Sequence, residues 1–227
     1  LFFSSKKTSQ KEQAWYHKKL QEFQNLPIQI IETKENAKLK TRKNDFKQIF
    51  PDWQAFFKHF QSEDNVSTLK KIVHFLRDYY LDYQDVENGE TPLHYACKIG
   101  NLEMVKILCP FAIGFNAISV QQMTPLHFAC ENGHTEIVKF LLDHSQKKGI
   151  IINTTNRFGW TPLHMASLEG HAEVVNLILE RADELEIQVN AADMSGQTAF
   201  DLAEDRQHED IIAAFQELNK RSVMFRT

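Results

Sequence analysis

Residues 124–142, TPLHFACENGHTEIVKFLL, are the stretch that decides the fold of this chain. Close variants begin at Thr91 (TPLHYACKIGNLEMVKIL) and Thr161 (TPLHMASLEGHAEVVNLIL), and a more divergent variant begins at Thr198 (TAFDLAEDRQHEDIIAAF). The four threonines are 33, 37 and 37 residues apart. Self-similarity at a fixed period of about 20–50 residues indicates a stack of equal units rather than one closed core.

Each copy of the phrase predicts a short helix. Threonine suits the N-cap position because its hydroxyl accepts a hydrogen bond from a free N–H of the first turn. The proline that follows has the fixed φ of a first helical residue. Leucine and alanine then recur at a spacing of three and predict one buried face: Leu93, Ala96, Leu126, Ala129, Leu163 and Ala166. Glycines that end these helices follow at Gly100, Gly133 and Gly170.

A second helix is predicted in each unit by a run of apolar residues, such as Ile137, Val138, Phe140, Leu141 and Leu142. The corresponding runs are Met104, Val105, Ile107 and Leu108 in the first unit and Val174, Val175, Leu177, Ile178 and Leu179 in the third. One such helix pair cannot bury its own apolar face, so stability depends on stacking against neighbouring pairs.

The phrase T-P-L-H-x-A, its period and the apolar helix that follows resemble the ankyrin repeat family over about residues 88–220. The resemblance implies an all-α ankyrin-repeat solenoid of helix-turn-helix units with β-hairpin fingers, preceded by an N-terminal helical region. It also implies that His94, His127 and His164 hydrogen-bond backbone between repeats. Metal binding by these histidines is not expected, because they recur once per repeat and metal sites need converging donors.

The expected organisation follows from where the phrase is intact. Residues 1–50 are expected to form a basic, aromatic-rich helical region, and residues 51–87 a divergent N-terminal capping repeat, since terminal repeats are atypical. Four repeats are expected at about 88–120, 121–157, 158–194 and 195–220, the last of them a polar cap, followed by a tail at 221–227.

Two departures from a regular repeat stand out. Extra residues follow Leu142 and Leu179 and are expected to lengthen the second helix or its loop on the convex side. Gln122 stands where the other hairpins have Gly89, Gly159 and Gly196, which suggests a different tip for that hairpin.

Charge is distributed unevenly along the chain. The net charge is −4, but residues 1–50 hold eleven Lys or Arg against five Asp or Glu, so the remainder is acidic. An acidic repeat array argues against nucleic acid as its ligand. No apolar run is long enough for a membrane span. Cys97, Cys109 and Cys130 do not make a disulfide framework, and Cys97 and Cys130, at equivalent positions of two repeats, are expected to be small buried residues of a reducing compartment.

In ankyrin arrays, the partner protein contacts the hairpin tips and the exposed side of the first helices, which form a concave surface. Arg157, Phe158 and Trp160 lie together on one hairpin, and binding hot spots are enriched in Trp, Tyr and Arg. The alternative is that Trp160 and Met123 only stack on the neighbouring hairpin. Carried onto this chain, the candidate protein-binding residues are Glu87, Glu90, Ile99, Ile118, Val120, Met123, Glu131, Arg157, Phe158, Trp160, Leu168, Glu169 and Met194.

These residues predict a protein-interaction module, an adaptor, inhibitor or targeting unit, whose partner has a basic or mixed apolar–basic surface. No enzyme activity, cofactor or metal site is expected, because the chain lacks a glycine-rich phosphate loop, C-x-x-C, H-E-x-x-H and G-x-S-x-G. One alternative is the targeting part of a larger enzyme or of a secreted bacterial effector. Another is lipid or nucleic-acid binding by residues 1–50. A monomer in the cytoplasm, or in the host cytoplasm for an effector, is expected, and the nucleus stays open.

Overall fold

A computed structural model describes Gln84 and residues 87–109 and 114–224, with side chains described as far as Lys220. All of these residues belong to the second of two units, Phe56–Thr227. The expected helical region at 1–50 lies outside the described residues, as does nearly all of the capping repeat expected at 51–87, and both stay predictions.

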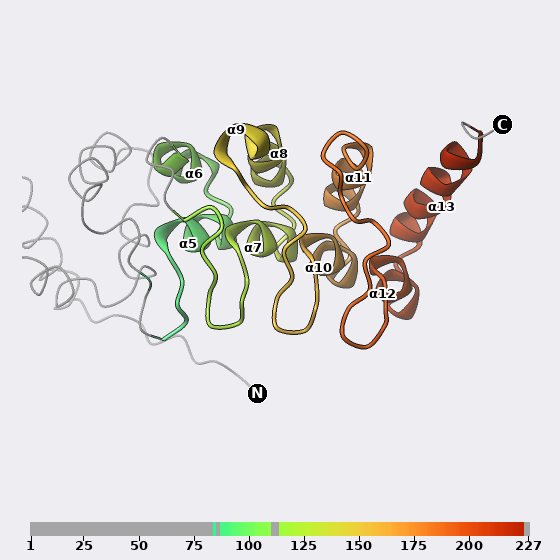
Figure 1. Cartoon of the computed structure of the whole chain (residues 1–227), viewed down its shortest axis with the longest axis horizontal. Coiled ribbons are helices and arrows are strands. Elements are labelled where there is room, and N and C mark those ends of the chain that lie inside the picture. Colours follow the sequence, from blue (N-terminus) through green and yellow to red (C-terminus); the bar gives the residue numbers. More distant parts are fainter. Residues whose placement is uncertain (1–83, 85–86, 110–113, 225–227) are drawn as a thin grey trace, which may run out of the picture. The chain divides into compact units, whose positions relative to one another are not determined.

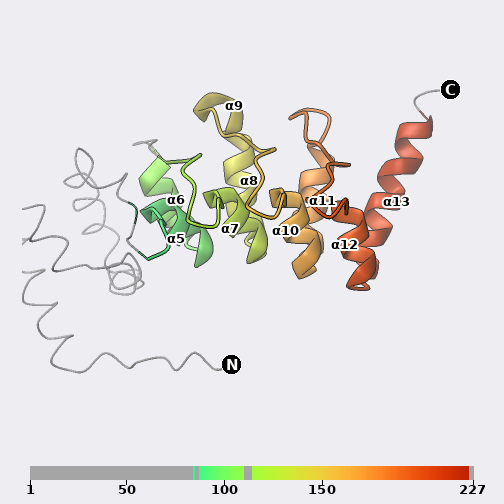
Figure 2. The same cartoon turned by 60° about the horizontal axis from the view of Figure 1, so that its bottom comes forward.

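The described helices form two rows, and successive units place one helix in each row (Figure 1). The rows remain separate when the view is turned by 60° (Figure 2). The first row holds α5 (Pro92–Lys98), α7 (Pro125–Glu131), α10 (Pro162–Glu169) and α12 (Ala199–Asp205). The second row holds α6 (Leu102–Leu108), α8 (Thr135–Asp143), α11 (Ala172–Glu180) and α13 (Glu209–Met224). We number the repeats one to four by these helix pairs.

The first helix of each repeat begins as its sequence predicts. Thr91, Thr124, Thr161 and Thr198 are the N-caps, with extended backbone and a hydroxyl that accepts from the N–H three residues later. The residue three positions after the N-cap makes a reciprocal hydrogen bond, in which its side chain accepts from the backbone N–H of the N-cap threonine. That residue is histidine in the first three repeats and Asp201 in the fourth.

The core lies between the two rows and continues from repeat to repeat. The second helices bury the residues that their apolar pattern predicts, including Val105, Val138 and Val175, which are 0% exposed. Phe140 and Leu177 are exceptions and are half-buried. Cys97, Cys109 and Cys130 are free, buried thiols, and desolvation raises the pKa of all three.

The extra residues after Leu142 and Leu179 lengthen the connection that follows the second helix. In repeat two they form the short helix α9 (Ser145–Lys148), which ends at Gly149 with a φ of 64°. In repeat three the equivalent residues, 181–186, form consecutive turns. Both connections lie at the edge opposite the hairpins (Figure 1).

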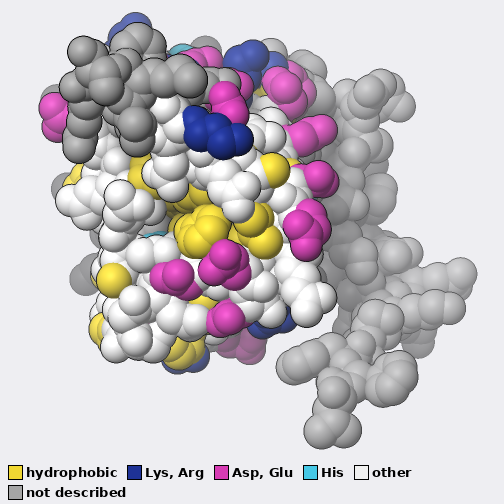
Figure 3. Space-filling model, turned by 90° about the vertical axis from the view of Figure 1, so that its right-hand side faces the viewer, with side chains coloured by type: hydrophobic (Ala, Val, Ile, Leu, Met, Phe, Trp, Pro, Cys, Tyr) yellow, Lys and Arg dark blue, Asp and Glu magenta, His cyan; other side chains and the backbone are white. Residues whose placement is uncertain are grey.

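The C-terminal end of the array is charged at its rim. Glu204, Asp205, Glu209 and Asp210 are exposed there. Figure 3 shows that hydrophobic side chains gather inside this rim. The end face is therefore less uniformly polar than the cap expected at 195–220.

Candidate functional site

Successive hairpins project from the first-row side of the array and are tied together by backbone hydrogen bonds (Figure 1). The N–H of Val120 donates to the carbonyl of Asn88 at 2.8 Å. The same bond recurs from Arg157 to Gln121 at 3.2 Å and from Met194 to Phe158 at 3.1 Å. Because each tip is bonded to the preceding one, the spacing of the tips is set by the backbone.

Each hairpin tip is closed by one polar side chain. Asn156 Oδ1 accepts from the N–H groups of Phe158 and Trp160 at 2.9 and 3.1 Å. Asp193 Oδ1 accepts from the N–H groups of Ser195 and Gln197 at 2.7 and 2.9 Å. Ser119 Oγ accepts from Met123 N–H at 3.2 Å in the equivalent place.

The hairpins are tight turns rather than strand ladders. The only β-bridge among the described residues joins Ala192 and Thr198, so the β-hairpin fingers expected from the sequence contain no regular strands in this part of the chain. The expectation of a different tip at Gln122 is wrong. Gln122 has a φ of 59°, close to the positive φ of Gly159 and Gly196, and its N–H donates to the carbonyl of Ser119.

Large apolar side chains are exposed at these tips. Ile118 is 50% exposed and Val120 66%, both on the hairpin of repeat two. Phe158, on the next hairpin, is 43% exposed, and Met194, on the last, is 78% exposed. Among the described residues, Ile151 is the other large apolar side chain in this class, and it lies away from the hairpins.

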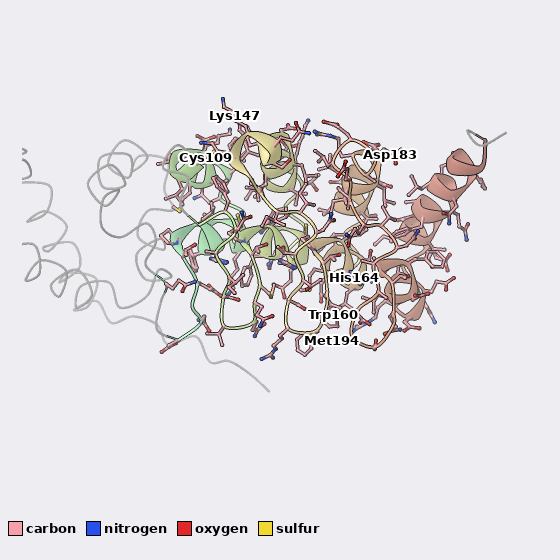
Figure 4. The ribbon with its side chains drawn as sticks, in the orientation of Figure 1. Cys109, Lys147, Trp160, His164, Asp183 and Met194 are labelled. Atoms are coloured by element: carbon pink, nitrogen blue, oxygen red, sulfur yellow. The ribbon has the colours of Figure 1, made fainter. Side chains whose placement is uncertain are left out.

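The hairpin of repeat three carries a fixed aromatic cluster. The rings of Phe158 and Trp160 lie 5.1 Å apart, and the Arg157 guanidinium lies 4.7 Å from the centre of the Phe158 ring. Trp160 Nε1 donates to Asp193 Oδ2 of the next hairpin at 2.8 Å, and Figure 4 shows Trp160 near the labelled Met194. Partial desolvation raises the Asp193 pKa, but hydrogen bonds from Ser195, Gln197 and Trp160 outweigh it and hold the pKa at about 2.

Carboxylates border the apolar tips. Glu169 is exposed and Glu131 is half-buried, at the ends of neighbouring first-row helices. Burial raises the pKa of Glu131, and the charge of Glu169 adds to that effect, while Lys98 opposes it. Lys98 Nζ pairs with Glu90 Oε1 at 2.8 Å and also lies 5.2 Å from the Phe128 ring centre.

Two of the residues expected at the surface are in fact buried. Met123 is 2% exposed, so it is a core residue, as the stacking alternative proposed. Glu90 is 6% exposed because it packs at the base of its hairpin against Lys98. Trp160 is half-buried and bonded to the neighbouring hairpin, which also fits the stacking alternative. Glu87 is exposed, and Ile99 and Leu168 are half-buried.

We call the accessible set the hairpin face. Its members come from three successive repeats and combine exposed apolar groups with carboxylates: Ile118, Val120, Glu131, Arg157, Phe158, Trp160, Leu168, Glu169 and Met194.

The histidines of the phrase connect each repeat to the one after it. His94 Nε2 donates to the Met123 carbonyl at 2.9 Å, and His127 Nε2 to the Trp160 carbonyl at 3.0 Å. His164 Nε2 makes the equivalent bond to the Gln197 carbonyl at 3.3 Å. Each Nδ1 accepts from the threonine N–H, so the ring is neutral with its proton on Nε2. Desolvation lowers the pKa of His127 to about 4 and also lowers that of His164.

A second set of histidines connects each repeat to the one before it, and the sequence argument missed them. His134 Nε2 donates to the Lys98 carbonyl at 3.1 Å, His171 to Glu131 at 2.9 Å and His208 to Leu168 at 3.2 Å. Their spacing of 37 residues, equal to the repeat period, was the available signal. These histidines bind backbone, and no group of His, Cys, Asp or Glu among the described residues could hold a metal ion.

Stacked helix pairs joined through tied hairpins define a helical-repeat protein (Figure 1). The model for ankyrin repeats in three copies matches residues 60–156, and the model for many copies matches residues 144–203. The chain therefore belongs to the ankyrin repeat proteins. Such repeats are generally protein–protein interaction modules and are typically non-catalytic.

Similar stretches occur in larger proteins. Over 53 residues, the chain is 38% identical to "Ankyrin repeat and LEM domain-containing protein 2" of Rattus norvegicus and of Mus musculus. It is 36% identical to the Homo sapiens protein of that name. Each match covers 23% of this chain and spans 6% of the length of the relative. Among the described residues, no helix is both long and apolar enough to span a membrane.

Proposed function

We propose that the hairpin face binds a partner protein, so that the chain acts as an adaptor, inhibitor or targeting unit. The observation that carries this proposal is the position of the exposed apolar side chains. Ile118, Val120, Phe158 and Met194 all lie on the hairpins of consecutive repeats, although an exposed hairpin gains no stability from them.

The geometry of these tips favours binding. The backbone bonds between hairpins hold the tips in register before any partner arrives, so less conformational entropy is lost on binding. Trp160 is also held in place by Asp193, which makes the Phe158–Trp160 pair a rigid anchor.

The proposed partner presents apolar and basic groups together. Glu131 and Glu169 border the apolar tips, and the nearby Lys98 is already paired with Glu90. A partner lysine or arginine would pair with these carboxylates and favour the charged form of Glu131. Binding should therefore weaken as salt is raised.

The test is binding to partners captured from lysate, comparing the parent with a variant carrying Arg157→Ala, Phe158→Ala and Met194→Ala. These three side chains are exposed, so their removal should leave the fold intact. Trp160 stays unchanged because its bond to Asp193 is structural. A specific partner should lose most of its binding to the triple variant.

A matched control is Ile151→Ala, which removes a 55% exposed apolar side chain from the connection that follows α9. It should bind the partner as the parent does. A second variant, Glu131→Gln with Glu169→Gln, should weaken binding and reduce its salt dependence. If the triple variant still binds the partner and the Ile151→Ala variant does not, the hairpin face is not the binding site.

A further inference from the structure

A polar clamp joins each long connection to the repeat before it. Asn116 Nδ2 donates to the Gly149 carbonyl at 2.7 Å, and Asn116 Oδ1 accepts from the Ile151 N–H at 2.9 Å. Asn153 does the same one repeat later, with the Glu186 carbonyl at 2.9 Å and the Gln188 N–H at 3.0 Å. Each asparagine side chain therefore hydrogen-bonds the backbone groups that flank one residue of the connection.

The residue between the two clamped groups is isoleucine in both cases. Ile150 is 8% exposed and Ile187 is half-buried, so each turns its side chain toward the array. In the second connection an ion pair adds a further contact, since Arg181 Nη1 donates to Asp143 Oδ1 at 2.6 Å. Residues 181–188 are thus held by Asp143 at one end and by Asn153 at the other.

A carboxylate and an asparagine at the positions of Asp143 and Asn153 occur once more, one repeat later, but no described segment of the chain is bound between them. Asn190 follows Asn153 by 37 residues and Glu180 follows Asp143 by 37 residues, the period of the repeat. Both side chains are exposed. Within the described part of the chain, neither side chain makes a hydrogen bond or an ion pair.

The fourth repeat does not supply the occupant. α8 and α11 end at Asp143 and Glu180, but α13 continues as a helix to Met224, beyond the register in which the other two helices end. In both views α13 inclines away from α11 toward its C-terminal end (Figures 1 and 2). The residue in the register of Arg181 is Leu218, which cannot pair with the Glu180 carboxylate.

We propose that Glu180 and Asn190 form a docking site for a segment of a partner protein. The segment has a basic residue, a turn, and then an extended apolar residue whose flanking backbone groups pair with Asn190. We infer the chemistry of this segment from residues 181–188, which fill the preceding site. There Arg181 forms an ion pair with Asp143, and the backbone groups that flank Ile187 hydrogen-bond to Asn153. Complementary charge selects the basic end, because Glu180 is the carboxylate in the position of Asp143.

The Glu180 end of this site lies in the second row of helices, away from the hairpins (Figure 1). Asp183, in the connection that leads to Asn190, lies at the edge opposite Trp160 and Met194 (Figure 4).

The probe is a labelled peptide with the sequence of residues 181–189, RADELEIQV, titrated into the full chain. The amide resonances of the Asn190 side chain should shift saturably, and fluorescence anisotropy should give the dissociation constant. Asn190→Ala should weaken binding about tenfold, because a bidentate pair of hydrogen bonds to the amide is lost. Glu180→Gln should weaken it about threefold, as expected for an exposed ion pair.

Matched controls separate this site from others. Asn176→Ala removes an exposed asparagine of α11 and should leave peptide binding unchanged. The variant carrying Arg157→Ala, Phe158→Ala and Met194→Ala should also bind the peptide normally, whatever its effect on the hairpin-face partner. A peptide with proline in place of Gln188, which lacks the clamped N–H, should not bind. The proposal is overturned if the Asn190 resonances do not move up to millimolar peptide, or if Asn190→Ala binds as the parent does.

Discussion

The imidazole of His171 fills the space that a side chain on Gly133 would occupy. A Cβ built on Gly133 would lie 2.5 Å from Nδ1 of His171, and the backbone of Gly133 has a φ of 70°. The same pairing joins Gly100 to His134 and Gly170 to His208. Glycine is therefore required at this position both for its backbone conformation and for the close approach of the next repeat.

This relationship predicts that Gly133→Ala is costly. The substitution should lower the free energy of unfolding by about 2–4 kcal/mol, because it adds a clash with His171 to the strain of a left-handed residue. Gly149→Ala is the control, since Gly149 has a similar φ of 64° but open space around it. It should cost about 1 kcal/mol. Urea unfolding measures both, and equal losses would contradict a role for the histidine ring.

The neutral histidines predict a loss of stability in mild acid. In the folded protein the pKa of His127 is about 4, whereas an unfolded histidine titrates near about 6.5. The unfolded state therefore binds more protons between these values, and stability falls as the pH is lowered from about 6.5 to about 4. For His127 alone the loss approaches about 3 kcal/mol.

The measurement is urea unfolding at a series of pH values. His127→Gln should be less stable at pH 7 and should show a shallower pH dependence in that window. An unchanged slope would mean that the titrating group lies elsewhere. Below about pH 4, a further loss is expected from Asp193 and Asp201, whose pKa values are lowered in the folded state.

Gln122→Gly is expected to stabilise the protein. Gln122 has a φ of 59°, a conformation that costs a residue with a side chain about 1 kcal/mol or more. Replacing it with glycine should raise the free energy of unfolding by about 0.5–1 kcal/mol after the entropy of the unfolded glycine is counted. Gly196→Ala reverses the change on a hairpin with open space around the Cβ and should destabilise by a similar amount. Thermal unfolding compares the two, and a destabilised Gln122→Gly would refute the strain argument.

Ser167 offers a second stabilising change. Its side chain is 0% exposed, and its hydroxyl has no hydrogen-bond partner among the described residues. Cys97 and Cys130 fill the equivalent positions of the first two repeats. Ser167→Cys should therefore raise the free energy of unfolding by about 1 kcal/mol, because an unsatisfied buried hydroxyl is removed.

The reverse substitution, Cys130→Ser, is the matched test. It places a hydroxyl in an equally buried position and should lower the free energy of unfolding by about 1–2 kcal/mol. Chemical denaturation under reducing conditions measures both variants. If Ser167→Cys is neutral while Cys130→Ser is destabilising, the Ser167 hydroxyl finds a partner in solution.

The helices and their starts could be predicted from the sequence because the signals are local. A threonine followed by proline fixes a helix start through its own hydrogen bonds, whatever lies beside it. The resemblance to ankyrin repeats supplied the bonds of His94, His127 and His164, which the structure shows.

Contacts between repeats were harder to predict. Met123 and Trp160 stand at the same place before their threonines, yet Met123 is buried and Trp160 half-buried. The outcome depends on the size of each side chain and on what the next hairpin offers, such as Asp193 for the indole. Asn116 and Asn153 gave a signal only through their shared period, since an isolated asparagine in a loop predicts nothing about a distant backbone group.

The cross-bonds between repeats are also the contacts that would carry a mechanical load on the array. Each joint between repeats carries its own set of cross-bonds, and a pull along the array loads the joints in series. The first two joints carry an asparagine clamp and histidine bonds of 2.9 to 3.1 Å, whereas the third lacks the clamp and has histidine bonds of 3.2 and 3.3 Å. The third joint instead has the Trp160–Asp193 bond between hairpins at 2.8 Å, so its cross-bonds lie at the hairpins and the helix ends, whereas those of the first two joints also reach the connections that follow the second helices.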